Sequence, residues 1–501
     1  MNLQGRRILI IQQRGWAITV GRLLAKKLQE EGCKLAALTL KRTTHEFVLN
    51  QKEVKYELIL NNDEIMSRPK DYLKGDVYPL GEICEALGID SIWPIVMTLR
   101  NHVRSYKDKF YYGFKQNVPD EEIIDYVMAV YKYINFIFDK FNPEIIIAPN
   151  FVALPQIMFN LFAKKRGVKM LVITDCKVVG YHIFTHNYIE SEGPFHDRVD
   201  ALNQGLAESE NKEKARQYIK EFRKNFEISE HITVLRQKKS FWKIIRHELS
   251  PYYHILRWYI KRPINHLENI GVTTDFRPPK IILRDFYCGK RYKRFMENFN
   301  YFPFEKIKKF VYFPLQFQPE AQIDVLAPYF SNQIETARLC AMSLPDDYTL
   351  VVKEHPAMVG YRSPSYIEKI DRTVNVKLID YRISSAKVLR GADLVISPNS
   401  TTIAEAVFLQ KPVIQLGELG TTLKLPNVYK HTDMATLSKK IKEILKIKCD
   451  INENNRKLEN YVAAVYDTGF SIKYNTIWNK GKGDFDALWK LFSSEIERNI
   501  K

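Results

Sequence analysis

The sequence predicts an α/β protein with two doubly wound parallel sheets, one in each half of the chain. Two observations support this fold class. Short apolar runs typical of buried strands alternate with stretches of helical periodicity in residues 7–175 and again in residues 310–417. In addition, 501 residues are too many for one ordinary hydrophobic core. We therefore expect a first domain in residues 1–300, a second domain in 301–455, and a C-terminal helical tail in 456–501.

The first domain opens with a β-α-β pattern. Strands are predicted over residues 7–12, 34–40, 144–148 and 169–174, and helices over 20–31, 121–141 and 154–165. Residues 51–142 as a whole predict a mostly helical, peripheral insertion. The loop after the first strand contains Arg14 and Gly15, and open α/β sheets place ligands at such carboxyl ends. Both residues are therefore candidates for contact with a substrate.

The second domain repeats this alternation. Strands are predicted over residues 310–315, 349–354, 376–379, 393–397 and 411–417, and helices over 331–343, 363–371, 384–390 and 403–410. A further strand is predicted at 280–283, on the approach to this domain, and a last helix at 485–498. Because strands and helices alternate along the chain, we expect the second sheet to be parallel.

One predicted strand of the second domain ends in Lys353-Glu354-His355-Pro356. Alternate side chains of a strand share a face, so Lys353 and His355 point the same way and Glu354 points the opposite way. Pro356 ends the ladder because it lacks an N–H donor. Two nitrogen donors thus converge at the carboxyl end of a strand, which suits an anionic ligand. His355 is the first candidate for catalysis, and a hydrogen-bonded loop histidine is the alternative.

A cluster of hydroxyl and amide side chains precedes the helix predicted at 403–410. The first N–H groups of a helix lack partners within it and favour a negative charge, so a phosphate suits this position. Ordinary N-capping uses the same hydroxyls and is the alternative interpretation. Glu405 lies in the predicted first turn, where it either accepts from a sugar hydroxyl or interacts favourably with the helix dipole. The candidate binding residues before it are Ser397, Asn399, Ser400, Thr401 and Thr402.

These motifs stand in the order of a known family. KEHP at 353–356, an S-x-x-S-T-T-x-x-E-A segment at 397–406 and K-P-V-I at 411–414 are flanked by related motifs within 311–428. The pattern resembles the capsule polysaccharide biosynthesis proteins, which include the Kdo transferases of capsule assembly. The resemblance implies a two-domain GT-B fold, with the domains facing a cleft and with a tail that crosses back to the first domain. It also implies a glycosyltransferase that uses a nucleotide-sugar donor, and it supports the sugar-hydroxyl role of Glu405.

Polar residues also follow the first strand of the second domain. If that strand continues past Pro314, Gln316, Gln318 and Glu320 share one face and could bind a base or a sugar edge. Polar loop residues without a ligand are the alternative interpretation.

A transfer reaction also needs a base for the acceptor hydroxyl. Such a group must lie across the cleft from the donor, and a carboxylate is the usual choice. Asp175 ends a predicted strand and is the first candidate, although each candidate also has a structural interpretation. Its rivals are Glu190, Glu192, Asp197, His186 and His196.

The composition limits the partners and the cellular setting. Lys and Arg number 76 against 58 Asp and Glu, a formal charge of +18, which indicates an acidic partner. Nucleic acid is not expected, because no RNA-binding motif is visible and the basic residues are spread out. The six cysteines are scattered and no apolar run is long enough to span a membrane, so a cytoplasmic protein is expected, with peripheral contact with the inner face of the membrane left open. No cofactor and no metal are expected, and Asp484 of the D-x-D at 484–486 is expected to cap the last helix.

Residues 238–265 mix Lys and Arg with Trp, Tyr and Phe. Cations combined with amphipathic rings are typical of an interfacial contact with an anionic membrane surface. A solvated helical hairpin that packs on the first domain through its aromatic residues is the alternative.

Together the observations favour a metal-independent glycosyltransferase. CMP-linked acidic sugars such as Kdo are the first choice of donor and UDP-sugars the second, and a surface polysaccharide or glycolipid is the expected acceptor. Three alternatives stay open: a polyol-phosphate transferase of teichoic-acid type, a nucleotide-sugar epimerase, and a non-enzymatic binder of anionic lipid.

Overall fold

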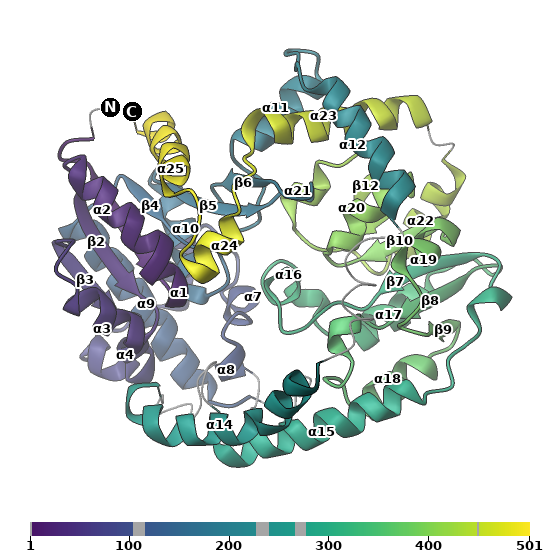
Figure 1. Cartoon of the computed structure of the whole chain (residues 1–501), viewed down its shortest axis with the longest axis horizontal. Helices are drawn as coiled ribbons and strands as arrows, with labels where there is room; N and C mark the ends of the chain where they lie inside the picture. The colour runs from purple at the N-terminus through teal and green to yellow at the C-terminus, as the bar shows by residue number, and fades with distance from the viewer. Residues whose placement is uncertain (1–2, 104–115, 227–239, 266–276, 448–449, 501) are drawn as a thin grey trace.

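The computed structural model describes residues 3–103, 116–226, 240–265, 277–447 and 450–500. Within these ranges the strands form two six-stranded sheets, each with helices on both faces. The two sheets belong to two lobes that lie side by side in Figure 1, and the N- and C-termini meet on the first lobe. The predicted fold class, two Rossmann-like domains, is confirmed. No helix in the described ranges is both long and apolar enough to cross a bilayer.

The first sheet has the strand order β3-β2-β1-β4-β5-β6. Its first five strands in that order pair in parallel, and β6 runs antiparallel to β5. This order is that of the dinucleotide-binding Rossmann fold, in which the chain reverses direction across the sheet between strands 1 and 4. The strands are β1 (Arg7–Gln12), β2 (Lys34–Thr39), β3 (Leu58–Asn61), β4 (Ile145–Ile147), β5 (Lys169–Asp175) and β6 (His182–Thr185).

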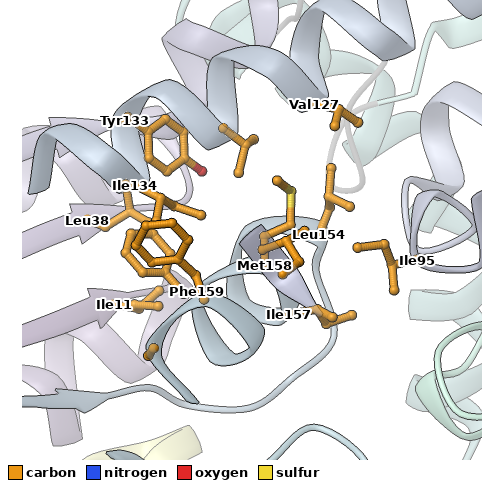
Figure 2. Close-up of a cluster of buried hydrophobic side chains, with 14 of the residues drawn as sticks. Ile11, Leu38, Ile95, Val127, Tyr133, Ile134, Leu154, Ile157, Met158 and Phe159 are labelled. Carbon is orange, nitrogen blue, oxygen red and sulfur yellow. The ribbon is translucent and has the colours of Figure 1, made fainter. Parts of the chain in front are cut away.

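Helices cover both faces of the first sheet. Alternate residues of each strand point to opposite faces, so each strand contributes to two cores. Leu9 and Ile11 of β1 face a core shared with α9 (Asp120–Lys140) and α10 (Leu154–Lys165). Figure 2 shows side chains from both helices meeting those of the strands there. Ile8 and Ile10 face α2 (Arg22–Glu30) and two helices from the end of the chain, α24 (Tyr474–Lys480) and α25 (Phe485–Asn499).

The second sheet is parallel throughout and has the order β12-β11-β10-β7-β8-β9. Counted from β7, this is the same order as in the first sheet, so the reversal falls between β7 and β10. The strands are β7 (Phe310–Pro314), β8 (Thr349–Lys353), β9 (Val376–Ile379), β10 (Leu394–Ser397), β11 (Val413–Gln415) and β12 (Val428–Lys430).

Helices also cover both faces of the second sheet. One face packs against α17 (Gln333–Met342), α18 (Pro364–Asp371) and α22 (Leu437–Lys446). The other packs against α19 (Ser385–Gly391), α20 (Thr401–Phe408) and α23 (Ile451–Thr468). The remaining helices are α1 (Arg14–Trp16), α3 (Arg42–Asn50), α4 (Asn62–Ser67), α5 (Pro69–Leu73), α6 (Leu80–Leu87), α7 (Trp93–Val96), α8 (Arg100–Val103), α11 (Pro194–Asn203), α12 (Lys212–Asn225), α14 (Phe241–Asn265), α15 (Pro279–Glu297), α16 (Ala321–Asp324) and α21 (Gly420–Leu423).

The two lobes contact each other directly. The backbone N–H of Gly420, at the start of α21, donates to the Ile189 carbonyl of the first lobe at 2.8 Å. The Arg100 guanidinium pairs with the buried Asp324 carboxylate at 2.9 Å. Helices α14 and α15 form a second connection along the lower edge of Figure 1, where α14 contacts α3 of the first lobe and α15 contacts α18 of the second.

Most predicted strands and helices are confirmed, and four details are wrong. Residues 280–283 belong to α15, because Pro279 sits at the first helical position and the apolar spacing after it is helical. The stretch 51–142 is not peripheral, since it supplies the edge strand β3 and the buried helix α9. The predicted loop at Arg14 and Gly15 is already helical. Finally, β7 ends at Pro314, so the three polar residues after it share no strand face.

We expect Gly420→Ala to destabilise the contact between the lobes. A Cβ atom there would lie 2.5 Å from the Glu190 carbonyl oxygen and 2.5 Å from the Ser191 Cβ, so the two backbones would have to separate. Overpacking of this kind costs about 1–3 kcal/mol. Urea unfolding should show the loss, and Gly81→Ala is the control, because its Cβ would meet nothing within 4 Å. Equal stability of the two variants would contradict the close approach.

Candidate functional site: a pocket at the strand reversal of the second sheet

The site is a cavity of about 330 Å³ at the carboxyl end of the second sheet. Its walls come from the segments after β7, β8, β9 and β10, around the point where the strand order reverses. Helices that leave neighbouring strands toward opposite faces leave such a crevice open, and open α/β sheets bind ligands there. The lining residues are Phe226, Gln316, Phe317, Glu320, Gln322, Lys353, His355, Pro356, Tyr381, Arg382, Ile383, Ser384, Ser385, Ala386, Ser400, Thr401, Thr402 and Glu405.

Lys353 is the last residue of β8 and is nearly buried. Its Nζ atom donates to the Ile383 carbonyl at 3.0 Å and to the Ser385 hydroxyl at 2.9 Å. Burial lowers the pKa of Lys353 to about 8, and the carboxylates of Glu405 and Asp380 oppose part of that shift. The lysine thus has a fixed position, and an anion entering the pocket would stabilise its charged form.

His355 follows β8 at the mouth of the same pocket. Its Nδ1 atom accepts a hydrogen bond from the Ala357 backbone N–H at 3.2 Å. Because Nδ1 is an acceptor, the neutral ring carries its proton on Nε2 and presents a donor there. The ring also packs edge-on against Phe317, with 6.1 Å between centroids.

A buried ion pair supports the segment that carries these two residues. Glu354 points away from the pocket, as predicted, and its Oε1 atom accepts from the Arg362 guanidinium at 2.7 Å. Both side chains are almost fully buried. Arg362 also donates to the Gln316 carbonyl, so it ties the segment after β8 to the segment after β7. Breaking a buried pair leaves a charge without compensation, so this contact strongly constrains the pocket's shape.

The N-terminus of α20 forms another part of the pocket wall. Ser400 is the N-cap residue, but its hydroxyl forms no capping bond and lies 3.2 Å from the buried Ser397 hydroxyl. The capping alternative is therefore wrong for Ser400. Thr401 and Thr402 form the start of the helix, where the N–H groups have no partner within the helix. Hydroxyls and helical N–H groups thus belong to the same pocket as Lys353 and His355.

Glu405 lies on the inner side of the same helix and lines the pocket. It is in the second turn rather than the predicted first turn, since α20 begins at Thr401. Burial raises the pKa of Glu405 to about 7, and the charge of Lys353 opposes the shift. Near neutral pH this carboxyl group can therefore either accept or donate a hydrogen bond.

Three of the predicted binding residues form hydrogen bonds within the protein and do not line the pocket. Gln318 is buried and donates to Asp324 at 3.2 Å. The Asn399 amide donates to the Gln322 carbonyl at 2.9 Å, and its carbonyl oxygen accepts from Gln415 at 3.0 Å. Ser397 lies behind Ser400 and accepts from Gln316 at 3.2 Å. The backbone N–H of Gln316 donates to Gln333, and its side-chain amide donates to the Pro314 carbonyl. Part of Gln316 also lines the pocket.

Charged residues of both lobes meet beside the pocket. Lys177 pairs with Asp175 at 2.7 Å and interacts electrostatically with Glu190 of the same lobe and with Glu320, which lines the pocket. Burial raises the pKa of Glu190, and the charge of Lys177 opposes this. The Glu190 carboxylate accepts from the Thr421 hydroxyl of the second lobe at 3.3 Å. Burial also acts to raise the pKa of Asp175, but Lys177 brings it below its usual value.

The other candidate bases lie in different surroundings. Glu192 is paired with Lys164, and burial, which acts to raise its pKa, is outweighed by that lysine. His186 is buried against Glu495 of α25 at 2.8 Å. Burial lowers the pKa of His196 to about 4. Asp197 lies in the first turn of α11.

The two predicted binding residues of the first lobe, Arg14 and Gly15, line a separate cavity. Arg14 and Gly15 lie at the strand reversal of the first sheet, in a space of about 510 Å³. It is also lined by Gln13, Asn150, Asn475, Trp478 and Asn479. The structure therefore does not bring Arg14 and Gly15 into the pocket of the second lobe.

Sequence reasoning missed Arg362 and Lys177. Neither belongs to a motif, and only the three-dimensional structure reveals their partners. A left-handed backbone conformation at Lys177, with φ of 63°, places its side chain back toward Asp175. No local pattern predicts this conformation for a lysine. In contrast, the predicted capping role of Asp484 is confirmed, because it accepts from the Ala487 N–H at 2.9 Å.

Part of the chain matches a known protein family. Residues 200–419 match the family described as capsule polysaccharide biosynthesis protein, so the resemblance inferred from the motifs is confirmed over that stretch. No curated protein matches the chain.

Three solved structures are similar to the chain. The β-Kdo 2,7 transferase of Thermosulfurimonas dismutans KpsC is 10% identical with a TM-score of 0.35, and covers 72% of this chain and 89% of its own. The β-Kdo 2,4 transferase of the same KpsC is 14% identical with a TM-score of 0.34, over 70% and 87%. UDP-GlcNAc 2-epimerase of Neisseria meningitidis, bound to UDP-GlcNAc, is 11% identical with a TM-score of 0.25, over 92% and 97%.

We expect Lys353 to titrate near pH 8, because burial disfavours its charged form. Competitive acetylation with peptide mapping by mass spectrometry should place its half-maximal reactivity there. Glu405→Gln should move that midpoint to lower pH, because the carboxylate that favours the charged lysine is lost. Glu418→Gln, in an exposed pair with Lys430, should leave it unchanged. Reactivity of Lys353 that matches exposed lysines would contradict the buried position.

Proposed function

We propose that the protein is a glycosyltransferase that moves a sugar from a nucleotide-sugar donor to a surface polysaccharide or glycolipid acceptor. One observation carries the proposal: Lys353, His355 and the N-terminus of α20 line the same pocket at the strand reversal of the second sheet. Cationic, imidazole and helical N–H donors that converge in this way fit the phosphates of a nucleotide. The reaction is assigned to the cytoplasm, where nucleotide-activated sugars are made.

The proposed chemistry is stabilisation of the leaving nucleotide. Cleavage of the bond between the sugar and phosphate builds negative charge on the phosphate oxygens. The Nε2–H of His355 and the first N–H groups of α20 would donate to those oxygens, and Lys353 would supply a positive charge nearby. Donors that are already in place need no rearrangement during the reaction, which makes such stabilisation a large catalytic effect. We propose that the reaction needs no metal ion and no cofactor.

The proposed donor follows from the family resemblance and the pocket. Glu405, whose pKa burial raises to about 7, lies where it could bind a hydroxyl of the ribose next to the phosphate. The capsule-type pattern favours a CMP-linked acidic sugar such as Kdo, followed by a UDP-sugar. Gln316 and Glu320, which line the same pocket, are candidates for contact with the base or the sugar.

Glu190 is the residue we propose as the general base. A base works best when its pKa lies near the working pH, and burial raises the pKa of Glu190 whereas Lys177 lowers that of Asp175. Glu190 also lies at the contact between the lobes, where it touches Thr421. An acceptor hydroxyl that enters between the lobes would meet this carboxylate beside the donor pocket.

The nucleotide site can be tested by thermal shift with CMP, CDP, UDP and GDP. We expect CMP or UDP to raise the melting temperature of the wild type, and His355→Ala to lose most of that rise and about 100-fold or more of the transfer rate. His431→Ala, which lies after β12 and does not line the pocket, is the control. Transfer at the wild-type rate by His355→Ala would remove the leaving-group role.

The product of the same reaction separates the rival functions. A glycosidic product supports the proposal. A phosphodiester product would instead identify a polyol-phosphate transferase, and conversion of the donor without an acceptor would identify an epimerase. If none of the nucleotides binds, the proposed donor site is wrong.

For Glu190→Gln we expect a transfer rate lower by about 100-fold or more, with an unchanged thermal shift by the nucleotide, because the amide cannot take a proton. Glu192→Gln is the matched control, since its carboxylate is already paired with Lys164 of the first lobe. Initial rates at saturating donor are the measurement. Full activity of Glu190→Gln together with inactive Asp175→Asn would transfer the role to Asp175.

A further inference from the structure

Helix α14 exposes a continuous apolar stripe. Eight large side chains along it are each between 54% and 75% exposed. They follow one another at spacings of one, three and seven residues, which places them on one side of an α-helix. These residues, named here the α14 stripe, are Phe241, Trp242, Leu249, Tyr252, Tyr253, Leu256, Tyr259 and Ile260. The predicted alternative, in which the aromatic residues pack on the first domain, is therefore wrong for the stripe.

A different side of α14 attaches the helix to the protein. Pro251 and Trp258 are buried, and they lie seven residues apart on the side away from the stripe. The helix also contacts α3 and packs along α15. The stripe is thus held outward by a helix that is already anchored, and exposed apolar surface of this kind marks an interaction site.

Basic residues accompany the stripe. Between residues 241 and 261, α14 carries four basic side chains and one acidic side chain, Glu248, which pairs with Lys290 of α15. The neighbouring helix α15 is also rich in cations, with Lys280, Arg284, Lys290, Arg291, Lys293 and Arg294. The four basic residues of α14 are Lys243, Arg246, Arg257 and Lys261. The surface around the stripe therefore attracts anions.

We propose that the α14 stripe docks on an anionic lipid bilayer. Tyr and Trp combine an apolar ring with a polar group and favour the boundary between headgroups and acyl chains. An amphipathic helix with such a face and flanking cations lies in the plane of the membrane, with its apolar side about 5–10 Å deep. An acidic protein surface would fit the cations but would leave this row of rings exposed to water.

Docking would orient both lobes at the membrane. Helix α14 rests on α3 of the first lobe, and α15 touches the second lobe where Gly289 and Gly360 approach closely. Figure 1 shows the two helices along one edge of the molecule, beneath both lobes. This inference goes beyond the proposed function, since it rests on α14 and α15 alone and holds whichever donor the pocket binds.

Vesicle co-sedimentation tests the proposal on the full-length protein. We expect the wild type to bind phosphatidylcholine vesicles that contain phosphatidylglycerol, with less binding at high salt and little binding to phosphatidylcholine alone. The stripe variant Phe241→Ser/Tyr252→Ser/Leu256→Ser should bind about tenfold less or weaker still, because the apolar area that enters the bilayer is lost. Lys243→Glu/Arg246→Glu should lose the preference for the anionic lipid.

The control places the same chemical change elsewhere. Val77→Ser/Leu206→Ser/Val374→Ser removes three exposed apolar side chains outside α14 and should bind vesicles like the wild type. Thermal shift by the nucleotide, measured on every variant, shows that the fold and the donor site are intact. Its absence in the wild type would count against the proposed function without affecting the vesicle result.

Three outcomes would overturn the docking proposal. The first is a wild type that does not bind vesicles containing phosphatidylglycerol. The second is a stripe variant that binds them as tightly as the wild type. The third is a wild type that forms a dimer in sedimentation equilibrium while the stripe variant is a monomer, because the stripe would then be the contact between two copies of the chain.

Discussion

The reversal of strand order between β7 and β10 is the constraint on which the site depends. Successive strands on either side of this point send their helices to opposite faces of the sheet, so no helix closes the carboxyl edge between them. The segments after four strands then face one space. The buried pair between Arg362 and Glu354 fixes two of these segments, since Arg362 also holds the Gln316 carbonyl. Loss of that pair would leave a buried charge unpaired, so the same contact stabilises both the fold and the shape of the pocket.

The electrostatics of the pocket are matched to an anionic ligand. Burial weakens the charge of Lys353 and of Glu405 alike, and each group moderates the shift of the other. The pocket therefore holds groups whose protonation a ligand can change. Phosphate would favour the charged lysine and the protonated glutamic acid, so binding and protonation are coupled. The charged cluster around Lys177 places a second set of groups at the contact between the lobes, beside the residues that line the pocket.

Local patterns predicted the fold well and the site in part. Apolar runs and helical spacing are strong signals, and they located nine of the twelve described strands to within a few residues, whereas β3, β6 and β12 were not predicted. Lys353, His355 and Thr401 were predictable because strand ends and helix starts place side chains by simple geometry. Gln318 and Asn399 were misjudged, because their amides bond to residues from other segments that no local pattern reveals. Residues 280–283 were assigned as a strand because a short apolar run fits both a strand and a half-buried helix. The predicted insertion at 238–265 includes residues 238 and 239, which lie outside the described residues.

The most direct measurement of the central claim is a crystal structure of the protein with CMP or UDP. We expect phosphate oxygens within hydrogen-bond distance of His355 Nε2 and of the N–H groups of Thr401 and Thr402, with the ribose near Glu405. A nucleotide bound instead in the cavity of the first lobe, between Gln13 and Asn150, would contradict it.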